Sequence, residues 1–327
     1  MRPRLGFLGV GWIGRNRMHA VAAADMATIV AVADTDHHAA TTAAAEVNAS
    51  AVTPEQLLGP ELDLDGAVIA TPSALHADQS LAALRHGRAV FCQKPLARTG
   101  PETRRVVDGA RDADRLLGVD MSYRHLAAVG RIRDVLGSGA IGEVYAADLT
   151  FHNSYGPDKP WFTDPALAGG GCVMDLGIHL VDLTLWLLDA PKLESVTSRL
   201  FARGRPLDPD PDVCEDYAVA RLDLASGATA TLTCSWFLHA GADAVIGATF
   251  HGTRGSVALH NVDGSFYDFV ATHRTGTSAR VLAEPPDEWG GRAAVAWVGG
   301  LAAAATFDPA ADDFIAGADV IDRIYGR

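Results

Sequence analysis

The sequence predicts an α/β fold, with an N-terminal doubly wound parallel sheet followed by an α+β domain that holds a large open antiparallel sheet. Three observations support this prediction: a length of 327 residues, short strands alternating with helices up to residue 121, and longer strand-like runs after it. A chain of this length is long for one domain and suits two. We therefore expect one domain over residues 1–121 and a second over residues 122–327.

The first 121 residues alternate between short apolar runs and helical patterns. Strands are expected at residues 5–10, 28–33, 66–70, 89–92 and 116–120, and helices at residues 14–24, 39–47, 74–86 and 99–113. Repeated strand–helix–strand units form parallel sheets that are covered on both faces. This half of the chain is therefore expected to be doubly wound.

Longer alternating runs dominate the remainder of the chain. Strands are expected at residues 142–152, 193–202, 216–224, 228–237, 245–251 and 256–260, with helices at residues 127–136, 175–188 and 309–325. Turn pairs such as Ser226-Gly227 and Asp263-Gly264 separate these strands. Short turns of this kind are typical of antiparallel sheets.

The charge is unevenly distributed between the two halves. The net charge is −13, and residues 121–327 contribute 15 basic and 26 acidic groups to it. This acidity disfavours nucleic acids and anionic membranes as partners. It is compatible with a cationic substrate in the second half, and equally with an acidic surface that keeps the protein in solution.

Cysteine usage and hydropathy predict the compartment. The four cysteines show no C-x-x-C spacing, and no apolar run reaches the roughly eighteen residues that span a bilayer. Reduced cysteines of this kind are typical of intracellular proteins. We expect a cytoplasmic protein with no membrane partner.

A glycine motif lies at the first strand-to-helix junction. Gly9, Gly11 and Gly14 form G-x-G-x-x-G directly after a predicted strand and at the start of a helix. In this context the first glycine permits a tight turn, the second admits a pyrophosphate, and the third packs helix against strand. The backbone of Trp12 and Ile13 then offers N–H groups to phosphate. The motif predicts a dinucleotide site.

Asp34 ends the second predicted strand, twenty residues after Gly14. A carboxylate there accepts hydrogen bonds from the adenosine ribose and repels a 2′-phosphate, so NAD is favoured over NADP. His37 and His38 would soften that repulsion. We expect NAD as the cofactor, with NADP the less favoured choice.

Two further segments follow parallel strands at the edge where a cofactor lies. Thr71, Pro72 and Ser73 follow the third strand, and His76 either contacts the ligands or packs within the fold. We count all four as candidate cofactor-binding residues.

Gln93 and Lys94 follow the fourth strand, and both are candidate cofactor-binding residues. An ammonium group there would stabilise a developing alkoxide, and a cis bond before Pro95 would aim it. The alternative is an exposed surface lysine, but the chain has few lysines. Lys94 is therefore a catalytic candidate.

A second constellation lies at residues 169–179. Three glycines precede Asp175 and His179, whose i, i+4 spacing places them on one helix face with Asp182. Histidine suits a general base that removes a hydroxyl proton. The alternatives are a buried histidine held by an aspartate and a metal pair. No further metal ligands are recognisable, so we expect no metal.

Together these motifs resemble the Gfo/Idh/MocA family, named for glucose-fructose oxidoreductase and inositol dehydrogenase. The matching stretches are residues 9–14, 70–76, 93–96, 123–124 and 169–179, and Asp182. The resemblance implies a Rossmann domain, a catalytic set of Lys94, Asp175 and His179, and a C-terminal sheet that joins subunits into a homodimer or homotetramer. It also implies reversible oxidation of a secondary alcohol on a sugar or cyclitol.

The chain departs from the family pattern at two positions. Gln93 stands where the family usually has glutamate, and Ser73 where asparagine is common. An amide at position 93 can still bond the nicotinamide ribose, but it brings no charge beside Lys94. We expect altered lysine basicity or cofactor affinity rather than an inactive protein.

The substrate pocket is expected to combine aromatic faces with polar side chains, which suits a sugar. Its candidate residues, besides Asp175 and His179, are Tyr123, Arg124, His152, Tyr155, Trp161, Trp236 and His239. An acidic run comprises Asp208, Asp210, Asp212, Glu215 and Asp216, and it suggests an amino sugar or aminoglycoside-like substrate or else a solvated loop. Alternative functions are an NAD-dependent glycosidase, a ketosugar reductase and a non-catalytic NAD-binding regulator.

Overall fold

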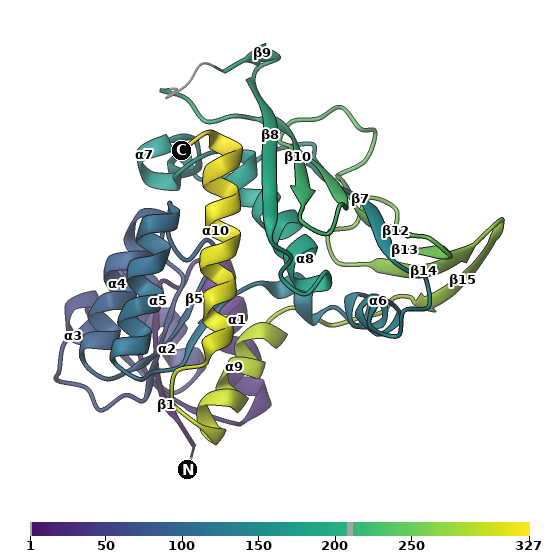
Figure 1. The fold of residues 1–327 in the computed structure, drawn as a ribbon. Coiled ribbons are helices and arrows are strands. Elements are labelled where there is room, and N and C mark those ends of the chain that lie inside the picture. Colours follow the sequence, from purple (N-terminus) through teal and green to yellow (C-terminus); the bar gives the residue numbers. More distant parts are fainter. Residues whose placement is uncertain (1, 208–211) are drawn as a thin grey trace. The chain divides into compact units, whose positions relative to one another are not determined.

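The computed structural model describes residues 2–207 and 212–327 (Figure 1). Contacts divide the chain into two units. The first unit runs up to Ser122 and includes Gly290–Ile315, and the second comprises Tyr123–Trp289 and Ala316–Arg327. The expected division placed every residue after 121 in the second domain, whereas the structure packs Gly290–Ile315 into the first unit.

The first unit is built on a six-stranded parallel sheet in the order β3-β2-β1-β4-β5-β6. Its strands are β1 (Arg4–Leu8), β2 (Thr28–Ala33), β3 (Ser50–Val52), β4 (Gly66–Ile69), β5 (Ala89–Cys92) and β6 (Leu117–Val119). Its helices are α1 (Trp12–Ala24), α2 (His37–Glu46), α3 (Pro54–Leu58), α4 (Ser73–Arg85), α5 (Gly100–Asp112) and α9 (Arg292–Ala303). This is the strand order of a Rossmann fold, with the reversal between β1 and β4.

Burial shows that both faces of this sheet are covered. Every residue of β4 and β5 is buried, although successive side chains point to opposite faces. The strand order and this burial confirm the predicted doubly wound sheet.

Trp297 of α9 explains why Gly290–Ile315 belongs to the first unit. A Cβ atom on Gly66 would lie 2.7 Å from the Trp297 indole, and one on Gly118 would lie 2.6 Å from it. The Trp297 and Phe91 ring centroids are 5.7 Å apart. Gly66 on β4 and Gly118 on β6 thus leave space for one indole. In the sequence, α9 is visible only as an apolar run.

The second unit contains a nine-stranded sheet in the order β15-β14-β13-β12-β7-β11-β10-β8-β9. Its strands are β7 (Val144–Asn153), β8 (Leu193–Ala202), β9 (Arg205–Pro206), β10 (Tyr217–Leu224), β11 (Thr229–Ser235), β12 (Ala244–Gly252), β13 (Gly255–Asn261), β14 (Phe269–Thr275) and β15 (Ser278–Ala283). Neighbouring strands pair antiparallel except β7 and β11, which are parallel. The sheet is therefore mostly, rather than wholly, antiparallel.

The helical elements of the second unit include α6 (Ala127–Gly137), α7 (Pro165–Ala168) and α8 (Ile178–Leu187), and α10 (Asp312–Tyr325) ends in it. A π-helical turn, η3 (Val173–Gly177), directly precedes α8. Among the described residues, one helical stretch, Pro165–Leu187, is long and apolar enough to cross a membrane. Its most apolar window is 83% buried inside the structure, as in the core helix of a globular protein.

Candidate active site

Two of the three motif glycines are required by contacts with the backbone. Gly9 has a φ of 86°, and a Cβ on it would lie 2.6 Å from the Ala70 carbonyl oxygen. A Cβ on Gly14 would lie 2.1 Å from the carbonyl oxygen of Gly9. These glycines hold the end of β1 close to the start of α1 and to the segment after β4.

Gly11 differs, because a Cβ placed on it would meet no heavy atom of the described residues within 4 Å. Helix α1 begins after Gly11 with no side-chain cap. Open space beside uncapped N–H groups at a helix start suits a phosphate group. The side chain of Trp12 is 69% exposed and that of Ile13 half-buried, so their expected contribution to a dinucleotide is the backbone N–H.

Asp34 follows β2 and ties the glycine turn to it. Its Oδ2 accepts a hydrogen bond from the Val10 N–H at 2.8 Å, and its Oδ1 accepts one from the Asp36 N–H at 3.0 Å. A carboxylate has about four acceptor positions, so these bonds leave capacity for ribose hydroxyl groups. The residues around the turn therefore fit a dinucleotide.

His76 links two segments at the carboxyl edge of the sheet. Its Nδ1 lies 2.6 Å from the Pro95 carbonyl oxygen and its Nε2 lies 2.6 Å from that of Thr71. The side chain is buried, and burial lowers the pKa of the imidazole. Because both ring nitrogens contact backbone carbonyl oxygens, the geometry favours the second of the two predicted alternatives, packing within the fold.

The segment after β4 is held by further polar contacts. The Thr71 hydroxyl donates to the Gln79 side chain at 2.6 Å, Pro72 precedes α4, and Ser73 is buried at the start of α4.

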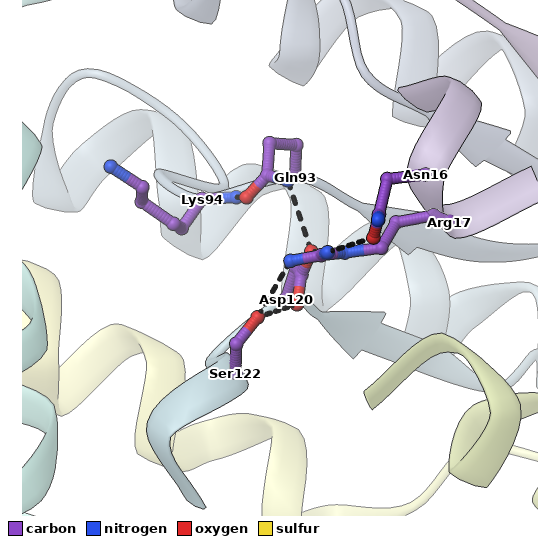
Figure 2. Close-up of polar contacts among 6 residues, drawn as sticks. All are labelled: Asn16, Arg17, Gln93, Lys94, Asp120 and Ser122. Carbon is purple, nitrogen blue, oxygen red and sulfur yellow. Dashed lines mark hydrogen bonds and ion pairs between the residues drawn. The ribbon is translucent and has the colours of Figure 1, made fainter. Parts of the chain in front are cut away.

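Gln93 and Lys94 begin the segment after β5, and the Lys94–Pro95 bond is cis. The Gln93 amide Nε2 donates to Asp120 Oδ2 at 3.0 Å, and its Oε1 accepts from the Lys94 N–H at 2.8 Å. The Lys94 side chain is half-buried and extends away from Asp120 (Figure 2).

Asp120 also receives a hydrogen bond from Arg17 Nε at 2.6 Å. Neither Arg17 nor Asp120 was recognised from the sequence. They are 103 residues apart, and no local pattern marks such a pair.

Asp175 lies in the π-helical turn η3, and His179 lies near the start of α8. The sequence predicted a regular helix from residue 175, which is wrong for the first turn. π-Helical turns are rare and are frequent at functional sites. Asp175 Oδ2 accepts a hydrogen bond from Trp236 Nε1 at 3.1 Å. The His179 ring centroid lies 4.9 Å from that of Tyr123.

Glu215 secures the glycine run before this turn. Its carboxylate accepts hydrogen bonds from the N–H groups of Gly171 and Val173 at 2.8–3.0 Å, and from the Tyr325 hydroxyl at 2.8 Å. The side chain is 2% exposed, and burial raises the pKa of this carboxyl group. Glu215 is therefore a structural residue and not a surface charge for a cationic substrate.

The other residues of the acidic run differ in their environments. Asp216 accepts a hydrogen bond from the Arg203 N–H at 2.7 Å, and Asp212 is exposed. Asp208 and Asp210 lie outside the described residues.

Arg124 and Asp182 form an ion pair in which Arg124 Nη2 and Asp182 Oδ1 are 2.6 Å apart. The Arg124 side chain is 18% exposed, and its guanidinium also lies 5.6 Å from the Trp186 ring centroid. These contacts hold the Arg124 side chain against α8.

Tyr123 belongs to a buried aromatic cluster with Phe151, Phe269 and Trp289, besides His179. Burial raises the pKa of the Tyr123 hydroxyl. The hydroxyl is therefore protonated near neutral pH, and the Tyr123 ring contacts the His179 ring at an interplanar angle of 50°.

The other predicted pocket residues occupy different environments. His152 Nδ1 lies 2.7 Å from the Ser235 hydroxyl, and its ring stacks on Tyr217 with centroids 5.9 Å apart. Burial lowers the pKa of His152. Trp161 stacks on the adjacent Phe162, while Tyr155 and His239 are exposed. Of the predicted aromatic wall, Trp236 contacts Asp175 and Tyr123 contacts His179.

The glycine turn and strand order define the first unit as a dinucleotide-binding fold. Residues 4–121 match the model of the oxidoreductase family with an NAD-binding Rossmann fold, and residues 129–258 match that of the GFO/IDH/MocA C-terminal domain. The chain belongs to the Gfo/Idh/MocA family of NAD(P)-dependent sugar and cyclitol oxidoreductases.

Two relatives support this assignment. The chain is 30% identical over 264 residues to 1,5-anhydro-D-fructose reductase of Ensifer adhaerens, covering 79% of this chain and 76% of the relative. It is also 30% identical over 265 residues to inositol 2-dehydrogenase of Rhizobium meliloti (strain 1021), covering 80% and 76%.

A solved structure shares the whole fold. GenD2 from gentamicin A biosynthesis, in complex with NAD, superposes with a TM-score of 0.82, covering 99% of this chain and 93% of GenD2 at 23% identity. At this identity the likeness shows the fold alone.

Proposed function

We propose that this chain is an NAD-preferring dehydrogenase that reversibly oxidises a secondary hydroxyl group of a sugar, amino sugar or cyclitol. One observation carries the proposal: Asp175 lies in a π-helical turn and His179 in the helix that directly follows it, in a chain whose glycine turn leaves space beside Gly11. Lys94 follows a parallel strand at the edge where such folds bind ligands.

The proposed cofactor contacts use residues of the first unit. The N–H groups at the start of α1 would hold the pyrophosphate, and Asp34 the adenosine ribose. Residues 71–73 and Gln93 would line the nicotinamide end. When bound, NAD⁺ supplies the hydride acceptor.

Each proposed catalytic residue has one task. His179 accepts the proton of the substrate hydroxyl, because an imidazole titrates near neutral pH. The Lys94 ammonium donates a hydrogen bond to the same oxygen and stabilises its developing negative charge. Asp175, fixed by Trp236, holds the substrate or orients His179.

Substitution of Lys94 or His179 tests these roles. We expect Lys94→Ala and His179→Ala each to lower kcat by about 10²–10⁴-fold, the usual contribution of a positioned acid or base. The measurement is NADH formation by absorbance across a panel of cyclitols, neutral sugars and amino sugars. NADH binding, followed by fluorescence, is expected to remain.

Lys159→Ala is the matched control, since the Lys159 side chain is 63% exposed and pairs with the neighbouring exposed Asp158. Unchanged turnover in both Lys94→Ala and His179→Ala would overturn the catalytic assignment. NADPH formation faster than NADH formation would overturn the NAD preference.

The panel also separates the alternative functions. A dehydrogenase accumulates NADH, whereas a glycosidase that uses NAD transiently releases sugar without net NADH. A ketosugar reductase would use the same residues in the reverse direction. The proposal of an amino-sugar substrate now depends on the overall acidity of the second half of the chain, because Glu215 is buried. Equal rates with neutral and aminated sugars would overturn that proposal.

We also propose a cytoplasmic homodimer or homotetramer joined through the nine-stranded sheet. The strands of this sheet carry exposed apolar side chains, including Tyr145, Val245 and Val281. The family resemblance, which implies subunit association through this sheet, motivates the proposal. Light scattering after size-exclusion chromatography would overturn the assembly by finding a monomer.

A further inference from the structure

We propose that Asp120 is a positioning residue for Lys94, acting through Gln93, and that it requires a neutral amide at position 93. The proposal rests on the proposed function in that it assigns Lys94 a part in the reaction. It is carried by a hydrogen-bonded network of the first unit that joins Asn16, Arg17, Gln93, Asp120 and Ser122 (Figure 2).

Asp120 is a buried charge with a defined counter-ion. It follows β6, its side chain is 0% exposed, and its Oδ2 lies 2.6 Å from Arg17 Nε on α1. The Arg17 side chain is 8% exposed, and its remaining guanidinium nitrogens donate to Asn16 Oδ1 at 2.7 Å and Ser122 Oγ at 2.9 Å. The Ser122 hydroxyl in turn donates to Asp120 Oδ1. A buried ion pair with these bonds has a fixed position and a fixed sign of charge.

Gln93 links this charge to the backbone of Lys94. Its Nε2 donates to Asp120 Oδ2 at 3.0 Å, and its Oε1 accepts from the Lys94 N–H at 2.8 Å. The carboxylate of Asp120 accepts only, so the amide nitrogen must face it and the amide oxygen must face Lys94. Asp120 therefore determines the orientation of the Gln93 amide. Through its bond to the Lys94 N–H, that amide determines the position of the Lys94 backbone.

The side chain of Lys94 points away from Asp120 (Figure 2). The network thus acts on the position of the Lys94 backbone and not through direct contact with its ammonium group. Catalytic side chains need support from hydrogen bonds behind them to remain within about 0.5 Å of a productive geometry.

The network also explains why glutamine is suitable at position 93. A glutamate there would lose the donor to Asp120 and place a second carboxylate about 3 Å from the first, where two such groups share a proton. Exchanging the two groups, as in Gln93→Glu with Asp120→Asn, again leaves one carboxylate and one amide beside Arg17 and removes the repulsion between two carboxylates. The single changes should therefore be harmful and the double change should compensate. The compensation should be partial, because Asp120 Oδ2 accepts from both Arg17 Nε and Gln93 Nε2, and an asparagine amide cannot replace both bonds.

Lysine-selective ¹⁵N labelling gives a test that needs no substrate. The chain has three lysines, Lys94, Lys159 and Lys192, so the labelled protein gives three backbone amide signals. Lys159→Arg and Lys192→Arg assign them. We expect Asp120→Asn to move the Lys94 signal and to speed its hydrogen exchange, while the Lys159 and Lys192 signals stay in place.

The pH dependence of the same signal tests the carboxylate pair. In Gln93→Glu, we expect the Lys94 amide signal to titrate with a midpoint about one pH unit or more above that in Gln93→Glu/Asp120→Asn. The charged and titratable groups of the network facing position 93 are Asp120, which follows β6, and Arg17 of α1. Gln93→Glu keeps the ion pair of Arg17 and Asp120, so this arm remains available if Asp120→Asn fails to fold.

Kinetics then test the consequence for the reaction. With the best substrate of the panel, we expect Gln93→Glu and Asp120→Asn each to lower kcat about tenfold, with a smaller change in KM for NAD. The double variant should recover at least about tenfold over the product of the single effects. Lys159→Ala is the control, because the exposed Lys159 side chain lies outside the network.

A Lys94 amide signal that is unaffected by Asp120→Asn, equal midpoints in the two glutamate variants, or additive kinetic effects would overturn the positioning role. A wild-type protein without dehydrogenase activity on the panel would instead overturn the proposed function. In that case the amide signal still decides whether Asp120 positions Lys94.

Discussion

Two glycine-rich segments, residues 9–14 in the first unit and residues 169–171 in the second, look alike in the sequence but differ in what surrounds them. A Cβ on Gly11 would meet nothing within 4 Å, whereas one on Gly171 would lie 1.9 Å from the carbonyl oxygen of Glu215. Helix α1 starts without a side-chain cap, while the N–H groups of Gly171 and Val173 donate to the Glu215 carboxylate.

Gly11 therefore leaves space for a ligand, whereas Gly171 leaves space for the protein's own backbone. Open space together with uncapped N–H groups suits a bound anion. Backbone contact together with an internal carboxylate provides a firm base for the π-helical turn that carries Asp175. A glycine motif therefore indicates a ligand site only when the atoms that surround it in space are known.

The largest effect is expected from Gly171→Ala. The added methyl group would overlap a backbone carbonyl that has no flexible side chain to move. Overpacking of this kind costs about 1–3 kcal/mol, and we expect the upper end or more, measured as the free energy of unfolding in urea. Unchanged stability would remove the contrast between the two segments.

Gly11→Ala should weaken ligand binding and leave stability nearly unchanged. Because no atom lies near the added methyl group, we expect stability within about 0.5 kcal/mol of the wild type. The methyl group would occupy the space of the pyrophosphate, so NADH affinity should fall by about tenfold or more, as a close backbone approach is lost. Fluorescence titration with NADH measures it, and Gly130→Ala on α6, also in open space, is the control. Wild-type NADH affinity in Gly11→Ala would contradict a ligand-binding role for this space.

The smallest effect concerns pH. Burial raises the pKa of Glu215 in the folded chain above the unfolded value of about 4.3. Its contribution to stability is therefore fully present below that unfolded value and is lost as the pH rises toward the raised folded pKa. Glu215→Gln keeps an acceptor oxygen but does not titrate. The wild-type advantage over this variant should shrink from pH 4.5 to pH 8 in urea unfolding, and parallel pH curves would show that Glu215 does not titrate in this way.

The sequence predicted regular strands better than irregular elements. β2 (Thr28–Ala33) and β5 (Ala89–Cys92) occur with the predicted bounds, because β-branched or apolar runs between turn residues mark buried strands. The short pair β3 and α3 was missed, although Thr53 and Gln56 form a capping box that is visible in the sequence. The hairpin of β14 and β15 was also missed, since β15 is largely exposed and lacks an apolar face.

The candidate site was predicted as residue types but not as a network. The glycine motif, Asp34, Lys94, Asp175 and His179 were recognised because each lies at a fixed offset from a strand or helix. Asp120 was not recognised, since its significance depends on Arg17, which is 103 residues away. The π-helical turn was missed as well, because no residue pattern distinguishes it from the α-helix that follows.

The packing of Trp297 against Gly66 and Gly118 has a consequence for cutting the chain. A fragment that stops at residue 121 lacks α9, so the surface of the sheet at Gly66 and Gly118 loses the indole that packs against it. The nucleotide-binding half is therefore discontinuous along the polypeptide: it is completed only after the whole of Tyr123–Trp289 has been synthesised. To isolate this half, one would excise that segment and splice Ser122 to Gly290, rather than truncate the chain once.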